Sequence, residues 1–390
     1  MPVPAPISPI SPTSGSDADF DAAEIERVVK SLSRRSPLPR SHFDPPTAAF
    51  LANRGRVVTL GMFIIDLFEV TDAAGNRVPG GDEAIGGGGI YAATAARLFL
   101  PPSHVGFIAD KAPDFPPTFE DTLRRLGDGM VWFRPAEGET TRALNVYSGS
   151  KIGTGHQTFQ YLARQAQLWP SDFLSPISPI ATPRPEWIHV VCDIGRAGAV
   201  LDDAEKWRAQ GWNGELAWEP LIRKPDPDAL PKYVALARRF GVFSPNHLEL
   251  QTILDEPDAD AETCARLFHG HLAAMGGPVP AIVIRAGADG AFTLSREWTG
   301  WVPAYFQDST RVVDPTGGGN SFFGGLLAGL ALSDGDFRAA TIYAATAASF
   351  AIEQRGLPIP TTSASGTELW NGESPWDRLH ALARRVDLSE

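Results

Sequence analysis

The stretch DPTGGGNSFFGG, residues 314–325, places three consecutive glycines between the strand-like RVV and the apolar, helix-like FFGGLLAGLAL. Glycines at 317–319 let the backbone turn sharply and direct successive N–H groups outward, and the following helix adds its positive N-terminal dipole. This pattern predicts a receptor for a phosphate or another oxyanion. The competing interpretation is a turn that allows close helix packing, which suits Gly324 and Gly325. The loop lacks the Lys-Ser/Thr pair of a P-loop.

The composition favours a globular protein that acts on small molecules. The chain has 390 residues, 43% of them hydrophobic, and a formal net charge of −12. An acidic balance opposes general nucleic-acid binding, so we expect no nucleic-acid partner. Only Cys192 and Cys264 occur, which excludes a disulfide framework and suits a reducing compartment. No apolar run reaches the roughly 18 to 20 residues needed to span a bilayer, so we expect a cytoplasmic protein with no membrane partner.

The first 52 residues differ in character from the rest of the chain. The opening MPVPAPISPISPTSGSDADF is rich in proline and serine, and it has no basic start followed by an apolar core. It therefore does not resemble a secretory signal. We predict a mobile arm over residues 1–52 and a single domain over residues 53–390.

From residue 56 onward, short β-branched runs alternate with longer helical stretches. This alternation predicts an α/β fold, a doubly wound and mainly parallel sheet flanked by helices. RVVTLGMFIID forms a first strand that ends at Asp66, and PEWIHVVCDIG forms a buried strand that ends near Asp193. Residues 67–85 alternate and contain the turn-like AAGNRVPGG, which predicts a hairpin or a small β lid. Binding sites are expected at the carboxyl ends of the parallel strands.

Three shorter motifs carry weaker signals. SPNHLEL places Asn246 and Glu249 on one face at a helix start, where they suit either hydrated magnesium near phosphates or only a polar first turn. RAGADG, residues 285–290, suits either nucleotide contact or a plain hairpin turn. GGGIYA, residues 87–92, loosely matches a dinucleotide fingerprint and has Asp110 about 20 residues later. Because VPGGDEAI before it is a poor buried strand, an NAD(P)-dependent dehydrogenase is a remote alternative.

The order of these motifs resembles the PfkB, or ribokinase-like, family of carbohydrate and nucleoside kinases. The resemblance runs from about Val57 to Gly356. It includes the strand that ends in Asp66, then GGGGIYAATAARL, VGFIAD, SPNHLEL, RAGADG and DPTGGGNSFFGGLLAGL. The last element is close to the family signature, Asp-Thr-x-Gly-Ala-Gly-Asp followed by a helix of small residues. Each short element is weak alone, but six in the same order make a specific signal.

The resemblance implies a ribokinase-like fold with a small β lid, and transfer of the γ-phosphate of ATP to an alcohol of a small molecule. It implies Mg²⁺ and a monovalent cation as cofactors, and it suggests a homodimer formed through the lid. Matching positions assign a role to each motif. The acceptor would be faced by Asp66, Gly88, Gly89 and Tyr91, and the nucleotide would lie beside Gly287 and Gly290. Magnesium, through water, and phosphate would be organised by Asn246 and Glu249, and Asp314 would have a structural or cation-related role. The catalytic anion hole would be formed by Gly317, Gly318, Gly319 and Asn320.

Two positions depart from the family pattern. Asn320 stands where the signature has its catalytic aspartate, and an amide can position a hydroxyl but cannot accept its proton. General-base catalysis contributes about 10² to 10⁴-fold, so this predicts a slow kinase. Tyr91 stands where sugar kinases of the family commonly have an asparagine, and it suits either the pocket or the core. Asp66 and Asp193 are candidates for a replacement base. The alternative is a pseudokinase that binds a nucleotide or ligand and acts through partners.

Overall fold

The computed structural model describes residues 38–71, 76–79, 83–148, 157–163, 165–222 and 226–388. Most of the predicted arm, residues 1–37, lies outside this set. Its last part belongs to the domain, because η1 (Arg40–Phe43) and α2 (Ala48–Leu51) precede the first strand and Phe43 is buried in the core. The Tyr343 hydroxyl also donates to the His42 carbonyl over 2.6 Å. The predicted boundary at residue 52 is therefore too late.

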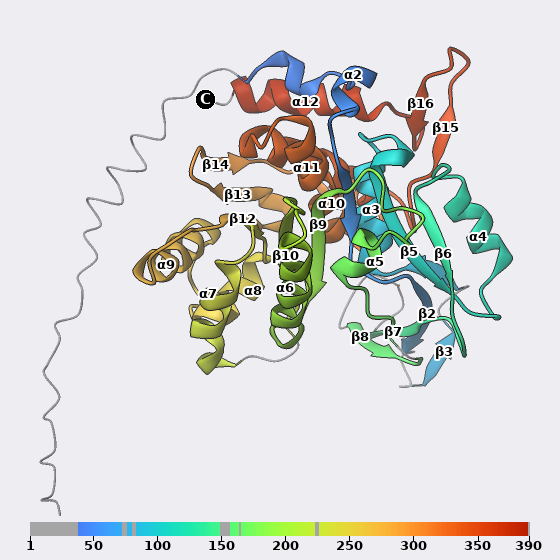
Figure 1. Cartoon of the computed structure of the whole chain (residues 1–390), viewed down its shortest axis with the longest axis horizontal. Coiled ribbons are helices and arrows are strands. Elements are labelled where there is room, and N and C mark those ends of the chain that lie inside the picture. The colour runs from blue at the N-terminus through green and yellow to red at the C-terminus, as the bar shows by residue number, and fades with distance from the viewer. Residues whose placement is uncertain are drawn as a thin grey trace, which may run out of the picture. The chain divides into compact units, whose positions relative to one another are not determined.

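A nine-stranded sheet forms the centre of the domain, in the order β14-β13-β12-β11-β10-β9-β1-β5-β6 (Figure 1). All neighbours from β6 to β12 pair in parallel, whereas β13 pairs antiparallel with both β12 and β14. This confirms the predicted mainly parallel sheet. The strands are β1 (Arg56–Thr59), β5 (Val105–Lys111), β6 (Val131–Pro135), β9 (Pro185–Cys192), β10 (Glu215–Pro220), β11 (Val242–Phe243), β12 (Ala281–Arg285), β13 (Ala291–Leu294) and β14 (Thr299–Val302).

Helices cover both faces of this sheet, because successive strand side chains point to opposite sides and both sides are apolar. Val57 and Val58, adjacent on β1, belong to two different core clusters. The cluster around Val57 includes helices α3 (Gly88–Arg97), α10 (Gly318–Leu332), α11 (Phe337–Ile352) and α12 (Pro375–Leu388); the cluster around Val58 includes α5 (Pro170–Leu174), α6 (Ile194–Arg208), α7 (Leu230–Ala237), α8 (His247–Leu254) and α9 (Ala261–Ala274). The cluster around Val57 also contains Leu123 of α4 (Pro117–Arg124). The chain further forms the 3-10 turns η2 (Pro102–His104), η3 (Pro227–Ala229), η4 (Gly287–Asp289) and η5 (Ser309–Arg311).

A second sheet confirms the predicted β lid and extends it. The hairpin strands are β2 (Ile64–Thr71) and β3 (Arg77–Pro79), and β4 (Ala84–Gly86) also pairs with β2. The lid then recruits β7 (Arg142–Ser148), which runs parallel to β2, and β8 (Gln157–Tyr161). These strands lie together in Figure 1. The lid therefore contains segments far from residues 67–85, because β7 pairs along almost the whole of β2.

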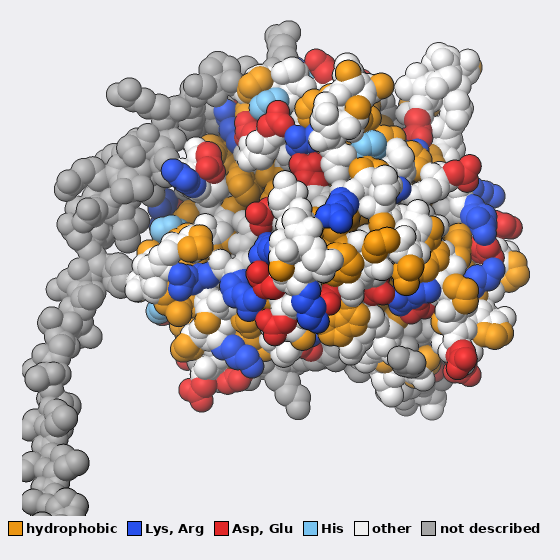
Figure 2. All heavy atoms as spheres, in the orientation of Figure 1, with side chains coloured by type: hydrophobic (Ala, Val, Ile, Leu, Met, Phe, Trp, Pro, Cys, Tyr) orange, Lys and Arg blue, Asp and Glu red, His pale blue; other side chains and the backbone are white. Residues whose placement is uncertain are grey.

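Two smaller observations complete the fold. A hairpin of β15 (Pro360–Thr362) and β16 (Glu368–Trp370) precedes α12. Across the described part of the chain, none of the helices has the length and apolarity required to cross a bilayer. Figure 2 shows acidic and basic side chains interspersed over the viewed face, in keeping with a composition that contains both in comparable numbers.

Candidate functional site

The three glycines form the turn into α10. Gly317 has a φ of +74°, the left-handed conformation that glycine adopts without strain, and a Cβ there would overlap the ring of Tyr91. Gly318 and Gly319 then begin the helix. The first-turn N–H groups of a helix have no acceptor within it, so this turn presents amides and the positive end of the dipole. The Gly318 N–H donates to the Pro315 carbonyl over 3.1 Å within this turn. Anion binding by the amides of the turn stays a prediction.

Tyr91 differs from its predicted place at the acceptor. Its side chain is only 4% exposed, and its ring lies under Gly317. Tyr91 is therefore better interpreted as a core residue than as a residue of the acceptor pocket, since its ring packs against the glycine turn. A side chain larger than hydrogen at position 317 cannot coexist with this ring.

A cavity of about 700 Å³ opens beside the first turn of α10. Its volume lies within the usual range for small-molecule sites. Its wall combines apolar and aromatic side chains with glycine backbone, and Gly290 has a φ of +99° and touches the backbone of Val302. The structure brings several predicted nucleotide-site residues into this one wall: Asn246, Gly287, Gly290, Gly318 and Gly319.

Asn320 ends the glycine turn and is bound to a buried carboxylate. Its Nδ2 donates to Oε2 of Glu219 over 3.0 Å. His189 lies 2.8 Å from the same oxygen through Nε2, and Thr59 lies 3.0 Å from its Nδ1. Because the carboxylate can only accept, His189 donates to it from Nε2. Glu219 is 3% exposed, so this network is buried.

Arg285 completes the network from the end of β12. Its Nη1 lies 2.8 Å from Oε1 of Glu219, while Nη2 lies 3.2 Å from the Ser244 carbonyl and 3.4 Å from Oε2 of Glu249. Burial alone would raise the pKa of Glu219, but the Arg285 charge and then the His189 hydrogen bond lower it to about 2. Glu219 therefore stays ionised at neutral pH and is a weak proton acceptor.

Glu219 and Arg285 were not predicted from the sequence as site residues. A signal existed for each. Glu219 is an acidic residue within an otherwise buried parallel strand, a place where charge requires a partner. Arg285 opens the RAGADG turn, but only the two glycines of that turn were predicted as nucleotide-site residues.

Asn246 and Glu249 form the start of α8. The Asn246 Oδ1 accepts from the Glu249 N–H over 2.8 Å, and the Glu249 carboxylate accepts from the Asn246 N–H over 2.7 Å. Burial raises the pKa of Glu249, and the Arg285 charge opposes that rise. The structure therefore contains the polar first turn that the sequence predicted for this helix. Among the described residues, no group of three or more acidic, histidine or cysteine side chains is arranged to hold a metal ion. A magnesium role for Glu249, through water, stays a prediction.

The predicted acceptor residues meet Asn320 along the glycine strip 86–89. Gly88 packs against Asn320, since a Cβ there would lie 2.7 Å from Nδ2, and a Cβ at Gly86 would overlap the carboxylate of Asp66. Gly89 similarly touches the backbone of Gly61. Asp66 and Asn320 therefore lie against two glycines of the same short strip. Each side chain fits there because its glycine has no side chain.

Asp66 is a buried carboxylate with unused hydrogen-bonding capacity. It is 8% exposed, and its Oδ1 is buried with no hydrogen-bond partner among the described residues. Burial raises its pKa to about 6, although a hydrogen bond with Asn145 opposes the rise. An acidic group in this state can accept a hydrogen bond from a ligand hydroxyl.

The other two candidate aspartates have local structural roles. Asp193 caps α6, accepting from the Arg196 N–H over 3.1 Å. Asp314 accepts from the Thr316 N–H over 2.9 Å and so shapes the approach to the glycine turn. Neither observation brings a carboxylate to Asn320, whereas Glu219 does contact it. The carboxylate that contacts Asn320 thus belongs to Glu219, which was not among the candidates for a replacement base.

Residues 197–364 match the sequence profile of the pfkB family carbohydrate kinases. This segment of the chain is similar to the pfkB carbohydrate kinases. It contains Glu219, Asn246, Arg285 and the glycine turn. By contrast, the strand before Gly87 is β4, which runs antiparallel to β2 in the lid. The βαβ context of a dinucleotide fingerprint is absent there, so the dehydrogenase alternative loses its basis.

Solved structures that match the chain share the ribokinase-like fold, and two sequence relatives match most of its length. A Schizosaccharomyces pombe protein, C16C9.01c, is 29% identical over 347 residues, which are 83% of this chain and 91% of the relative. Protein MAK32 of Saccharomyces cerevisiae is 28% identical over 342 residues, or 83% and 90%. Ribokinase from Giardia lamblia superposes with a TM-score of 0.61 at 19% identity, covering 78% of this chain and 96% of its own. Arabidopsis thaliana ribokinase complexed with ribose and ATP gives 0.58 at 14%, covering 85% and 99%.

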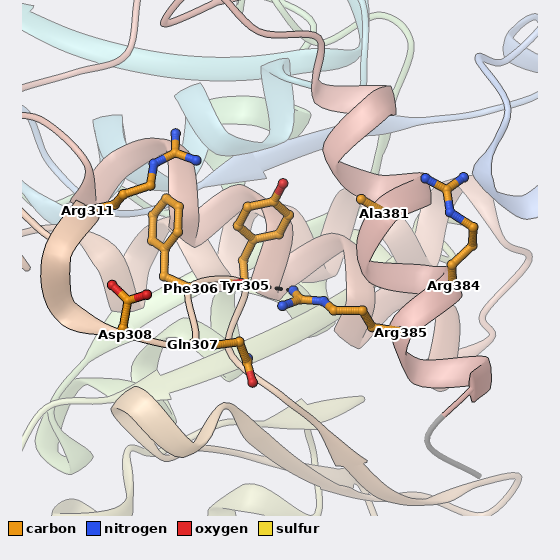
Figure 3. Close-up of a pocket in the computed structure, with 8 residues that line it drawn as sticks. All are labelled: Tyr305, Phe306, Gln307, Asp308, Arg311, Ala381, Arg384 and Arg385. Carbon is orange, nitrogen blue, oxygen red and sulfur yellow. Dashed lines mark hydrogen bonds between the residues drawn. The ribbon is translucent and has the colours of Figure 1, made fainter.

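A second cavity of about 550 Å³ lies against the C-terminal helix α12 (Figure 3). Residues 305–308 line both cavities. Arg385 of α12 donates to the Tyr305 carbonyl over 2.9 Å and lies over the Tyr305 ring. The C-terminal helix therefore supports a wall of the larger cavity. The second cavity is lined by Tyr305, Phe306, Gln307, Asp308, Arg311, Ala381, Arg384 and Arg385.

Proposed function

We propose that the protein is an ATP-dependent phosphotransferase that acts on a hydroxyl of a small molecule, a sugar, a nucleoside or a related compound. One observation carries the proposal. The first turn of α10 stands between the 700 Å³ cavity, which Gly318 and Gly319 line, and the strip on which Asn320 and Asp66 lie. Amides at that position face charge that develops on a group passing from one side to the other.

The cavity fits the nucleotide that the family implies. A nucleotide needs an apolar slot for its base and donors for its phosphates, and the cavity has both in Phe322 and the α10 amides. When bound, ATP with Mg²⁺ supplies the phosphoryl group. Asn246 and the carboxylate of Glu249 would hold magnesium through water, and Asp314 would lie near a monovalent cation.

Asn320 positions the acceptor in this mechanism without taking its proton. Its Nδ2 is engaged by Glu219, so Oδ1 is the atom left to accept from an acceptor hydroxyl. Asp66 would accept a second hydrogen bond through Oδ1. The hydroxyl proton then passes to an oxygen of the transferred phosphoryl group. Without the aspartate of the family signature, this route is slower by up to about 10² to 10⁴-fold, while positioning and electrostatic stabilisation persist.

The second candidate is a pseudokinase that binds a nucleotide as a regulatory protein. The specific observation in its favour is again the Asn320–Glu219 hydrogen bond, which ties the expected catalytic position to a weakly basic buried carboxylate. A cytoplasmic location, and a homodimer formed through the lid, belong to both candidates as proposals.

The two functions are separated by binding and turnover measured on the same preparation. ATP with Mg²⁺ should raise the melting temperature under both, by an amount that grows with ligand concentration. Sustained ADP release with one member of a panel of sugars and nucleosides supports the phosphotransferase. Nucleotide binding without turnover across the panel supports the pseudokinase. Tighter binding of NAD(P) than of ATP would contradict both.

A further inference from the structure

Two arginines of α12 give the second cavity an excess of positive charge. Arg384 is exposed and Arg385 is partly buried, and both line the cavity (Figure 3). Neither forms a salt bridge with an acidic side chain among the described residues. Asp308 is the single acidic residue among the described residues that line this cavity. The chain as a whole has a formal net charge of −12, so this local surplus runs against the charge of the protein.

The third arginine that lines the cavity, Arg311, is neutralised by nearby carboxylates. Its Nη2 lies 2.9 Å from Oε2 of Glu353 and 3.3 Å from Oε1 of Glu373. The buried Arg378 pairs with the same two glutamates, over 2.8 and 2.6 Å. These two carboxylates therefore already serve two guanidinium groups, and they do not compensate the charge of the α12 arginines.

The guanidinium of Arg385 is held in place and keeps donors for a ligand. Its Nη2 donates to the Tyr305 carbonyl over 2.9 Å, and its Cζ lies 5.2 Å from the centroid of the Tyr305 ring. The ring attracts the charge without an N–H···O hydrogen bond. A guanidinium has five N–H groups, and the carbonyl uses one of them. Arg385 can therefore donate two parallel hydrogen bonds to one phosphate group.

The loop side of the cavity offers hydrogen-bond acceptors. The Oδ1 of Asp308 accepts from the N–H and the hydroxyl of Thr310, which leaves Oδ2 to accept from a ligand. Gln307 donates through Nε2 to the Ala304 carbonyl over 2.8 Å, which leaves its Oε1 as an acceptor. A carboxylate and an amide oxygen bind hydroxyl groups, and the carboxylate repels an anion. The cavity thus has a cationic end on α12 and a hydroxyl-binding end on the loop.

We propose that the second cavity binds a sugar phosphate, with the phosphate group on Arg384 and Arg385 and the sugar hydroxyls on Asp308 and Gln307. The volume of about 550 Å³ lies within the usual range for small-molecule sites. This site is distinct from the proposed site of phosphoryl transfer, and the inference does not depend on that function. If the two arginines only support the loop and keep the helix hydrated, no phosphate ester binds there.

Isothermal titration of the full chain tests the proposal. The probes are glucose 6-phosphate, ribose 5-phosphate and inorganic phosphate. Arg384→Gln and Arg385→Gln each remove one guanidinium from the cavity. Arg124→Gln on α4 is the matched control, because Arg124 also lies over an aromatic ring, that of Phe133, and lines neither cavity. Gly319→Ala, in the first turn of α10, reports phosphate binding in the larger cavity instead.

We expect at least one of the two sugar phosphates to bind more tightly than inorganic phosphate. Arg385→Gln should weaken its binding by about ten- to hundredfold, the range for a hydrogen bond to a charged group. Arg384→Gln should weaken it by about two- to fivefold, because the side chain is exposed. Arg124→Gln and Gly319→Ala should leave the Kd at the wild-type value.

Three results would overturn the proposal. The first is that the wild type binds neither sugar phosphate, and the second is that it binds both no more tightly than inorganic phosphate. The third is an unchanged Kd in both arginine variants; if Gly319→Ala then weakens binding, the phosphate lies at α10 and the proposed function stands.

Arg385→Gln also loses the hydrogen bond to the Tyr305 carbonyl, so it is the variant most at risk of unfolding. If it does not fold, Arg384→Glu replaces it, because a change at an exposed position preserves the fold and reverses one charge of the cavity. The melting temperature without ligand checks the fold of each variant. Loss of sugar phosphate binding in a folded Arg384→Glu supports the proposal, and an unchanged Kd overturns it.

Discussion

Replacing Asn320 by aspartate, the residue at this place in the signature that the sequence resembles, should lower the stability of the protein. The new carboxylate would stand where Nδ2 now lies, 3.0 Å from Oε2 of Glu219. The substitution removes a hydrogen bond and places two buried carboxylates against each other. Glu219 does not readily take up a proton to relieve the repulsion, because Arg285 and His189 stabilise its ionised form.

The size of the penalty follows from that distance. Two unit charges about 4 Å apart at an effective dielectric constant of about 20 repel by about 4 kcal/mol. The introduced aspartate can avoid this repulsion by keeping its proton, which costs about 1.4 kcal/mol for each unit between its normal pKa of about 3.9 and pH 7, or about 4 kcal/mol. Both routes therefore give a loss of about 4 kcal/mol at pH 7. This is a large part of a typical domain's stability.

The pH dependence has a definite sign. The introduced aspartate has a pKa that is higher in the folded state than in the unfolded state, so the folded state binds more protons. The variant's stability relative to wild type is therefore best below pH 4 and declines as the pH rises toward neutrality. Glu219→Gln combined with Asn320→Asp returns the network to one carboxylate at the same net charge. The combination should recover most of the loss and should raise turnover above that of wild type.

The assay is urea unfolding of the wild type, the two single variants and the double variant at pH 5 and pH 7.5, analysed as a double-mutant cycle. ADP release with the best acceptor of the panel is measured on the same four proteins. Equal stability of Asn320→Asp and wild type at pH 7.5 would refute the reasoning, because it would mean that the two side chains are not in contact. Higher activity of the single variant than of the double variant would refute the catalytic part.

Three further predictions concern neighbouring groups. Gly317→Ala should destabilise the fold by about 1 to 3 kcal/mol and abolish ATP binding, checked by unfolding and titration, because its φ is +74° and its Cβ overlaps Tyr91. Asp66→Asn should raise the KM for the acceptor and leave the Kd for ATP unchanged. In the wild type, kcat/KM should rise with pH near 6 as Asp66 ionises, and this rise should be absent from the variant. Wild-type stability should fall below about pH 4.5, toward the lowered pKa of Glu219, and acid unfolding of Glu219→Gln should lack that part of the loss.

Motifs that act through local backbone geometry were predictable from the sequence. The turn at Gly317, the polar start of α8 at Asn246 and the turn at Gly290 each depend on neighbouring residues and on dihedral angles, so their residue types identify them. The lid was predicted only in its hairpin part. Its partner strand β7 lies about 75 residues farther along the chain, and pairing at that separation leaves no local pattern.

The identity of the side chains around Asn320 depends on the tertiary structure. Thr59, His189, Glu219 and Arg285 come from β1, β9, β10 and β12, and no spacing rule joins them. Sequence reasoning proposed Asp193 as a neighbouring carboxylate because it ends a strand, but that side chain caps α6. Whether a charged residue near a strand end contacts the site depends on which strands are neighbours.

The sequence by itself determined the parallel α/β fold, the resemblance to the pfkB kinases and the glycine turn that presents helix amides, because each is written in short patterns of residue type. Only the tertiary structure decided what the turn faces: a cavity on one side, with Arg285 at its edge, and on the other an asparagine held by Glu219. The physical reason is that a buried charge requires its partner in space. That partner is chosen by the order of strands in the sheet, which no local stretch of sequence records.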